Sequence, residues 1–189
     1  MKFVQTLSRL FNVEVGTIIG DNVNSLLQEY QQNRNVHYIK KITVLNLIIT
    51  ASVTTYTYKS GAEGLNIQLT DLVNYIEQLV IPELTEEKFD HLMLLKAACL
   101  KFVYMFRNQI PDNFVHPFVI QICNFLKSES PVNKSYAAAC IEKLLTRKTL
   151  NGDSFIFQPG QVDQSIITAL LQNLCTLLQE TKNLYAMRS

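Results

Sequence analysis

The chain has 189 residues, enough for one domain with a hydrophobic core. Its 17 basic and 16 acidic residues leave a net charge of +1, which gives no electrostatic basis for binding nucleic acid or an anionic membrane. Only 17% of the residues are charged, against about 25% in an average domain, so we expect neighbours to cover many elements on two sides.

Two sequence features bear on the environment of the protein. The longest uncharged segment, residues 42–58, contains Thr, Asn and Ser and is too short to span a bilayer, so we expect no membrane insertion. The cysteines have no CxxC or CxxH spacing that would indicate zinc. Each lies in an apolar helical stretch, and we expect buried, reduced thiols at Cys99, Cys123, Cys140 and Cys175.

The first third of the chain contains two long segments of different character. VGTIIGDNVNSLLQEY has the apolar period of a helix, and its Gly16 and Gly20 predict close packing against a neighbouring helix. Residues 37–58 are rich in β-branched residues, which favour a strand. An isolated strand would lack hydrogen-bond partners, and the other long segments are helical, so we predict a helix there.

The next segment, residues 59–68, is longer than the packing of a helix pair requires. Long loops often bind partners or gate a site, although a tolerated insertion is the alternative. The candidate partner-contact residues of this loop are Lys59, Ser60, Glu63, Asn66 and Gln68.

An acidic cluster follows at the turn before the central helix. We interpret it as a solvated corner, with contact to a basic partner as the alternative, and it comprises Glu83, Glu86, Glu87 and Asp90. The basic residues at Lys40, Lys41 and in EKLLTRKTL are interpreted in the same way, as solvated or helix-terminal charge. The central helix is apolar nearly all round, which predicts packing between neighbours.

The segment YMFRNQIPDNF, residues 104–114, is interpreted as a structural joint between two helices. Arg107 and Asn108 are placed to satisfy the last carbonyls of the first helix. Pro111 stops that helix, and Asp112 or Asn113 can cap the next one.

The helices recur as pairs. First helices begin near residues 37, 88 and 131, and second helices begin near residues 69, 112 and 162. A period of about 40 to 50 residues is typical of HEAT and armadillo repeats. We therefore predict an all-α fold, an α-α superhelix (HEAT-repeat solenoid) with about four helical pairs, at roughly 1–32, 37–83, 88–127 and 131–181. Neither end has the polar face of a capping repeat, so we expect an internal piece of a longer solenoid.

Nothing in the sequence indicates catalysis, a cofactor or a metal. His37, His91 and His116 lie in different segments without metal-ligand spacing, and no nucleotide-binding or hydrolase motif is present. A helical enzyme is therefore the least supported class.

Four blocks carry a family resemblance: NVNSLLQEY (22–30), LKAACLKFVYMFRNQIP (95–111), YAAACIEKLL (136–145) and ALLQNL (169–174). The amino-acid sequences of these blocks, their order and their spacing resemble the exportin-2 family of the importin-β superfamily. The resemblance extends from about residue 7 to residue 189. The resemblance implies a central HEAT-repeat segment of a receptor that carries importin-α out of the nucleus together with Ran-GTP and shuttles between nucleus and cytoplasm.

The resemblance also implies particular roles. The family changes conformation and does no chemistry, and it has an insertion in a central repeat where residues 59–68 lie. We expect protein partners only, no nucleic acid, and a monomeric segment that binds weakly by itself. A HEAT or armadillo scaffold unrelated to Ran is the alternative function.

Overall fold

The structure, a computed structural model, describes residues 6–7, 10–57, 61–65, 69–88, 90–149, 151–152, 154–158 and 164–180. The elements in chain order are α2 (Asn12–Gln32), α3 (Arg34–Ser52), β1 (Val53–Thr57), β2 (Gly61–Leu65), α4 (Leu69–Tyr75), the π-helix η1 (Ile76–Val80), α5 (Ile81–Leu84), α6 (Met93–Met105), α7 (Asp112–Asn124), the 3-10 helix η2 (Phe125–Lys127), α8 (Pro131–Leu145) and α9 (Gln164–Glu180).

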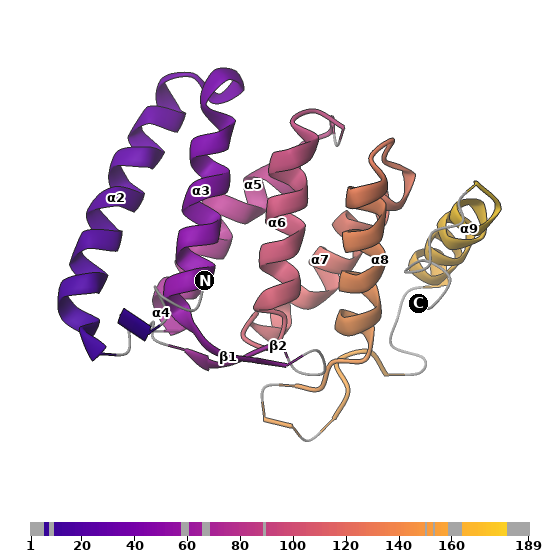
Figure 1. Cartoon of the computed structure of the whole chain (residues 1–189). Helices are drawn as coiled ribbons and strands as arrows, with labels where there is room; N and C mark the ends of the chain where they lie inside the picture. The colour runs from indigo at the N-terminus through magenta and orange to yellow at the C-terminus, as the bar shows by residue number, and fades with distance from the viewer. Residues whose placement is uncertain are drawn as a thin grey trace.

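The helices form two layers. In Figure 1, α3, α6 and α8 stand side by side in a front row, and α4, α5 and α7 lie behind them. Helix α6 packs against both α3 and α8, while α2 packs on α3 and α7 packs on α8 and α9. This stacking of successive helical pairs is an α-α superhelix, which confirms the predicted fold class.

Local signals set several helix ends. Asn33 separates α2 from α3 with an extended backbone, and its side chain accepts a hydrogen bond from the backbone N–H of Val36. Ser130 accepts from the backbone N–H of Asn133, and Pro131 takes the first position of α8. Both helix starts therefore have an N-cap side chain, and α8 also has a proline at the first position, where no backbone N–H is needed.

The core runs through the middle of the stack. Helix α6 is buried on most of its circumference, as the sequence predicts for a helix that packs between neighbours. Its fully buried apolar side chains are Leu95, Cys99, Leu100, Phe102 and Val103. Phe89, which the same pattern includes, lies outside the described residues.

The prediction of one helix over residues 37–58 is wrong at its C-terminal end. Helix α3 ends at Ser52, and the next five residues form strand β1, which pairs antiparallel with β2. The register places Val53 opposite Leu65 and Thr57 opposite Gly61. The strand propensity of the β-branched residues prevails here because the segment predicted as a loop supplies the partner strand.

Two packing predictions are also wrong. A Cβ atom on Gly16 or Gly20 would meet no heavy atom within 4 Å, so neither glycine lies against a neighbouring helix. Cys175 is exposed, whereas the other three cysteines are buried as expected. The boundaries of the four helical pairs stay a prediction; residues 1–5 of the first pair and residue 181 of the last lie outside the described residues.

Candidate interaction surface

The corner after α6 is organised by Arg107. This residue is only 1% exposed. Its Nη1 donates to the carbonyl oxygen of Tyr104 at 2.6 Å, and its guanidinium carbon lies 4.7 Å from the centre of the Tyr104 ring. The side chain therefore satisfies a carbonyl of the last turn of α6 and covers the apolar end of the helix.

The other residues of the predicted joint, Asn108, Pro111 and Asp112, lie from the end of α6 to the first residue of α7. Asn108 is exposed, and Pro111 is the N-cap residue of α7. Neither Asp112 nor Asn113 holds the predicted N-cap position, because Pro111 is the N-cap residue and Asp112 is already the first helical residue. The Asp112 carboxylate instead accepts from Nη2 of Arg147 at 2.9 Å. Arg147 is 4% exposed, so this part of the basic segment is buried and paired, contrary to its predicted solvation.

The β-hairpin rests on the same corner. Gln109 donates from Nε2 to the carbonyl oxygen of Ala62 at 2.6 Å. Gly61 has φ +78°, and a Cβ atom there would lie 2.7 Å from both the Met105 carbonyl oxygen and Nη1 of Arg107. A glycine is needed at this position because the backbone conformation and the close approach both exclude a larger residue.

The predicted partner-contact loop is only partly placed. Glu63 lies in strand β2, and its side chain is outside the described part of the chain. The other four candidates, Lys59, Ser60, Asn66 and Gln68, also lie outside the described residues. The structure therefore shows what anchors the hairpin, and it does not place the side chains that were expected to contact a partner.

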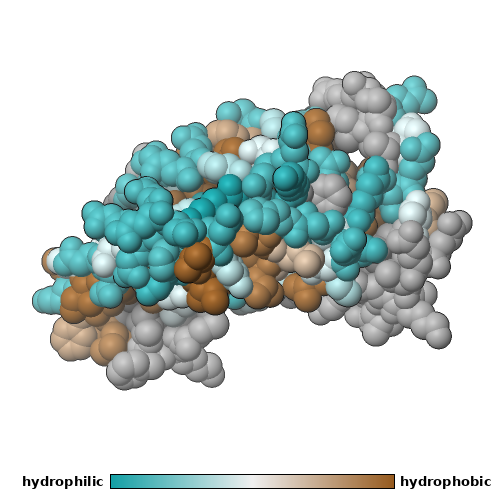
Figure 2. All heavy atoms as spheres, turned by 90° about the horizontal axis from the view of Figure 1, so that it is seen from above, coloured by the Kyte–Doolittle hydropathy of each residue, from teal (hydrophilic) through white to brown (hydrophobic). Residues whose placement is uncertain are grey.

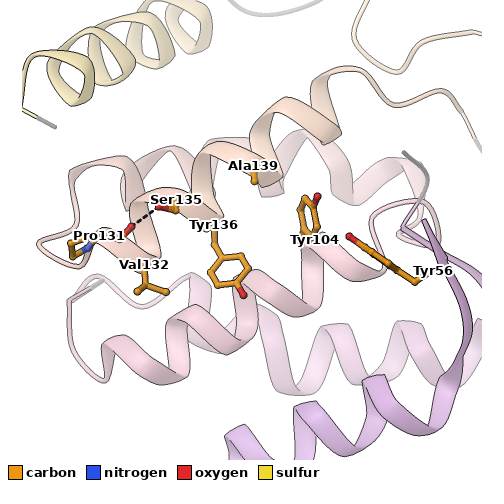
Figure 3. A pocket seen from close by; sticks show the side chains of 7 residues that line it. All are labelled: Tyr56, Tyr104, Pro131, Val132, Ser135, Tyr136 and Ala139. Carbon is orange, nitrogen blue, oxygen red and sulfur yellow. Dashed lines mark hydrogen bonds between the residues drawn. The ribbon is translucent and has the colours of Figure 1, made fainter. Parts of the chain in front are cut away.

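A groove of about 500 Å³ opens between the hairpin and two helices of the front row. Three tyrosines from three elements line it: Tyr56 of β1, Tyr104 of α6 and Tyr136 of α8. Their rings lie in a row in Figure 3, where Tyr136 points from α8 toward α6 and Tyr104 points from α6 toward α8. The remaining lining residues come from α8 and are Pro131, Val132, Ser135 and Ala139.

Apolar side chains also reach solvent in the first turns of the front-row helices. Val36 on α3, Leu94 on α6 and Val132 on α8 are each at least 50% exposed. Seen from above in Figure 2, hydrophilic residues cover the middle of this end of the molecule, and hydrophobic patches gather along one long side. Exposed apolar patches of this kind are typical of surfaces that contact other proteins.

The acidic cluster is a buried ion network, so the predicted solvated corner is wrong for its main residue. Glu83 is 2% exposed. Its Oε1 accepts from Oη of Tyr30 and Nζ of Lys41, both at 2.8 Å, and its Oε2 accepts from Nη2 of Arg34 at 2.7 Å. The sequence interpretation missed this arrangement because the partners lie 42 to 53 positions away.

Glu86 extends the network to α6. It accepts from Nη2 of Arg34 at 2.9 Å and from Nζ of Lys96 at 2.5 Å, and Lys96 also donates to the carbonyl oxygen of Glu83. Lys96 is completely buried. The network therefore joins α2, α3, α5 and α6, and its charges are used within the fold and not offered to a basic partner.

The ionisation of the network follows from these contacts. Burial would raise the pKa of Glu83, but the hydrogen bond and charge of Lys41 hold it below its usual value. Burial likewise opposes the Lys96 and Arg34 contacts at Glu86, and the pKa of Glu86 is still lowered. Burial and then the hydrogen bond to Glu83 raise the pKa of Tyr30. The network therefore contains two carboxyl groups whose pKa values are lowered, and the phenol of Tyr30 donates to one of them.

The remaining two residues of the acidic cluster, Glu87 and Asp90, are not part of the buried network. Glu87 is exposed, as predicted for a solvated corner. Asp90 accepts from Oγ of Ser128 at 2.5 Å and from the backbone N–H of Glu129 at 3.1 Å, which fixes the turn between η2 and α8. The side chain of His91 is 41% exposed, and its Nδ1 lies 3.6 Å from Oε1 of Glu86.

Chemical sites are not indicated among these groups. In the part of the chain that the structure describes, no three His, Cys, Asp or Glu side chains come together as metal ligands would. Burial raises the pKa of Cys99 to about 12 and that of Cys123 to about 11, so both are held as thiols. Among the described helices, none combines the length and apolar character that a membrane crossing needs.

These features define an α-helical solenoid. Comparison with known proteins gives its family: residues 1–141 match the Cse1 family, and the chain belongs to it. The chain is 29% identical to human exportin-2 and to exportin-2 of Drosophila melanogaster, in each case over 98% of this chain and 19% of the relative. Exportin-2 of Dictyostelium discoideum is 31% identical over 78% of this chain and 15% of its own length.

A solved structure agrees with the fold. The structure described as the exportin Cse1 in its cargo-free, cytoplasmic state superposes with a TM-score of 0.80 at 21% sequence identity. The alignment covers 98% of this chain and 19% of that chain. The chain thus spans about a fifth of the length of the relatives that it matches.

Proposed function

We propose that this chain is a segment of a nuclear transport receptor whose full-length form exports importin-α from the nucleus in a complex with Ran-GTP. The observation that carries the proposal is the match of residues 1–141 to the Cse1 family, since the relatives matched over 98% of the chain are named exportin-2. Such a receptor shuttles between nucleus and cytoplasm.

The proposed mechanism is conformational, with no catalysis. Stacked helical pairs contact only their neighbours, so small changes at each junction add up along a solenoid. Partner binding then selects among superhelical shapes. The buried ion network has a structural role in this proposal, because its charged groups bond to one another and hold four helices together.

The hairpin region is the proposed partner-contact element. Its supporting feature is the anchoring at Gly61 and by Gln109, which fixes the hairpin against the corner after α6, beside the groove that Tyr56 lines. Lys59, Ser60, Glu63, Asn66 and Gln68 remain the proposed contact residues. The 189-residue chain alone is proposed to be monomeric and to bind importin-α or Ran weakly, because a solenoid receptor distributes its contacts over many repeats.

The experiment compares full-length receptor binding to importin-α in the presence of Ran loaded with GTP or with GDP. Tight ternary assembly with Ran-GTP and loss of assembly with Ran-GDP is the expected result. Equal binding in both nucleotide states contradicts the export function and leaves the alternative, a HEAT scaffold unrelated to Ran.

A further inference from the structure

The tyrosine groove is built from parts that lie far apart in the sequence. β1, α6 and α8 each contribute one tyrosine, and α8 adds Pro131 and Val132 at its first turn. None of the seven lining residues carries a charge at neutral pH. A charged occupant would give up part of its hydration without meeting a counter-charge in the lining, which favours an uncharged peptide over an acidic or a basic one.

The aromatic side chains of the groove further restrict the kind of peptide that could bind in it. The rings of Tyr136, Tyr104 and Tyr56 follow one another along it (Figure 3). A row of aromatic side chains without charges suits an extended segment that presents flat apolar groups at a regular spacing. A polyproline II helix does so with three residues per turn, and it is stiff before binding, so little conformational entropy is lost.

We infer that the groove formed by Tyr56, Tyr104, Tyr136 and Val132 binds an uncharged, proline-rich segment of a partner protein in the polyproline II conformation. The proline rings pack on the tyrosine rings. Because that helix has no internal hydrogen bonds, its backbone carbonyls remain available to polar groups at the rim and to water.

The hairpin anchor prepares the groove for this ligand. Tyr56 is 42% exposed and belongs to a strand whose partner strand is held at Ala62 by Gln109 and at Gly61 by close contact with the end of α6. The wall that Tyr56 supplies is therefore fixed relative to Tyr104, which lies in the last turn of α6. A groove that is formed before binding costs less free energy to occupy.

The test measures binding of a fluorescein-labelled, uncharged peptide of about twelve residues, roughly four turns of polyproline II, with proline at two of every three positions. Fluorescence anisotropy is recorded with the full-length protein. The main variant is Val132→Lys, which puts a charge at a half-exposed groove position. Its matched control is Val36→Lys, the same change in the first turn of α3, where Val36 is 64% exposed outside the groove.

We expect the proline peptide to bind, Val132→Lys to weaken binding at least about tenfold, and Val36→Lys to leave it within about twofold. Tyr56→Ala is a second variant with the same expected loss, and thermal unfolding checks that each variant is folded. A peptide with leucine in place of proline should bind more weakly.

Three outcomes overturn the inference. They are no binding of the proline peptide, no loss of binding in either groove variant, and equal or tighter binding of the leucine peptide. The last would show that the groove accepts any apolar segment. The transport function is tested separately, since importin-α and Ran-GTP binding could persist when the proline peptide fails.

Discussion

Gln109 and Ala62, 47 positions apart, are joined by a hydrogen bond of 2.6 Å from the Gln109 side chain to the Ala62 carbonyl oxygen. This bond attaches the hairpin to the corner between α6 and α7. Gly61 lies beside it in a left-handed conformation against the Met105 carbonyl oxygen and Arg107. The corner therefore joins α6 to α7. It also holds the hairpin, whose strand β1 forms one side of the tyrosine groove.

Gly61→Ala is expected to destabilise the hairpin by about 1–3 kcal/mol, because the added Cβ meets backbone and the positive φ is strained. Gly152→Ala is the matched control, since Gly152 has the same φ of +78° and no heavy atom within 4 Å of an added Cβ. Hydrogen exchange of residues 53–57 and 61–65 should increase for Gly61→Ala only. An equal loss of unfolding free energy in both variants would assign the Gly61 effect to φ alone.

Removal of the Glu83 carboxylate should have a large effect on the free energy of unfolding. Glu83→Ala leaves Lys41 and Arg34 without their shared acceptor, and breaking a buried pair in this way costs about 3–5 kcal/mol. The control is Glu29→Ala, which breaks the half-exposed Glu29–Lys40 pair and should cost less than about 1 kcal/mol. Urea unfolding measures both, and similar losses would contradict a structural role for the buried network.

The same network predicts a loss of stability in acid. Because the folded-state pKa values of Glu83 and Glu86 are lowered, their contribution is complete above the ordinary carboxyl pKa of about 4.5. It is lost as the pH falls below that value and through the lower folded-state values, since the unfolded chain then takes up protons first. Urea unfolding between pH 7 and pH 3 should show this decline.

The variant Glu83→Gln supplies the comparison for the pH experiment. It removes one of the two titrating groups while keeping the size of the side chain, so it should be less stable at pH 7 and should lose less stability on acidification. An acid dependence as steep as that of the unchanged protein would show that other carboxylates cause the decline.

The sequence predicts the helical layers well because each depends on a local period. Leu95, Cys99 and Phe102 show the period of α6, and Pro111 and Pro131 mark the starts of α7 and α8. Local patterns cannot identify partners that are distant in the chain. The strand at 53–57 is missed for this reason, since its stability depends on pairing with 61–65 across a segment predicted as a loop.

The candidate site is less predictable still. Glu83 belongs to a run of acidic residues that normally indicates a solvated turn, and only the fold brings Tyr30, Arg34 and Lys41 to its carboxylate. The tyrosines of the groove lie 32 to 80 positions apart and follow no shared motif. Residues 95–111 are one of the four blocks that carry the family resemblance, but the contact of this corner with the hairpin depends on the three-dimensional arrangement.

The cysteines give the last prediction, because the structure separates one exposed thiol from three buried ones. Cys175 should react with a thiol reagent at pH 8 in the folded 189-residue chain, while Cys99, Cys123 and Cys140 should react only on unfolding. Burial raises the pKa of each of these three thiols, so the reactive thiolate is scarce as well as inaccessible. Counting titrated thiols before and after urea gives one and then four, and Cys175→Ser should remove the reaction of the folded chain. More than one rapidly reacting thiol in the folded protein would contradict the packing of α6, α7 and α8.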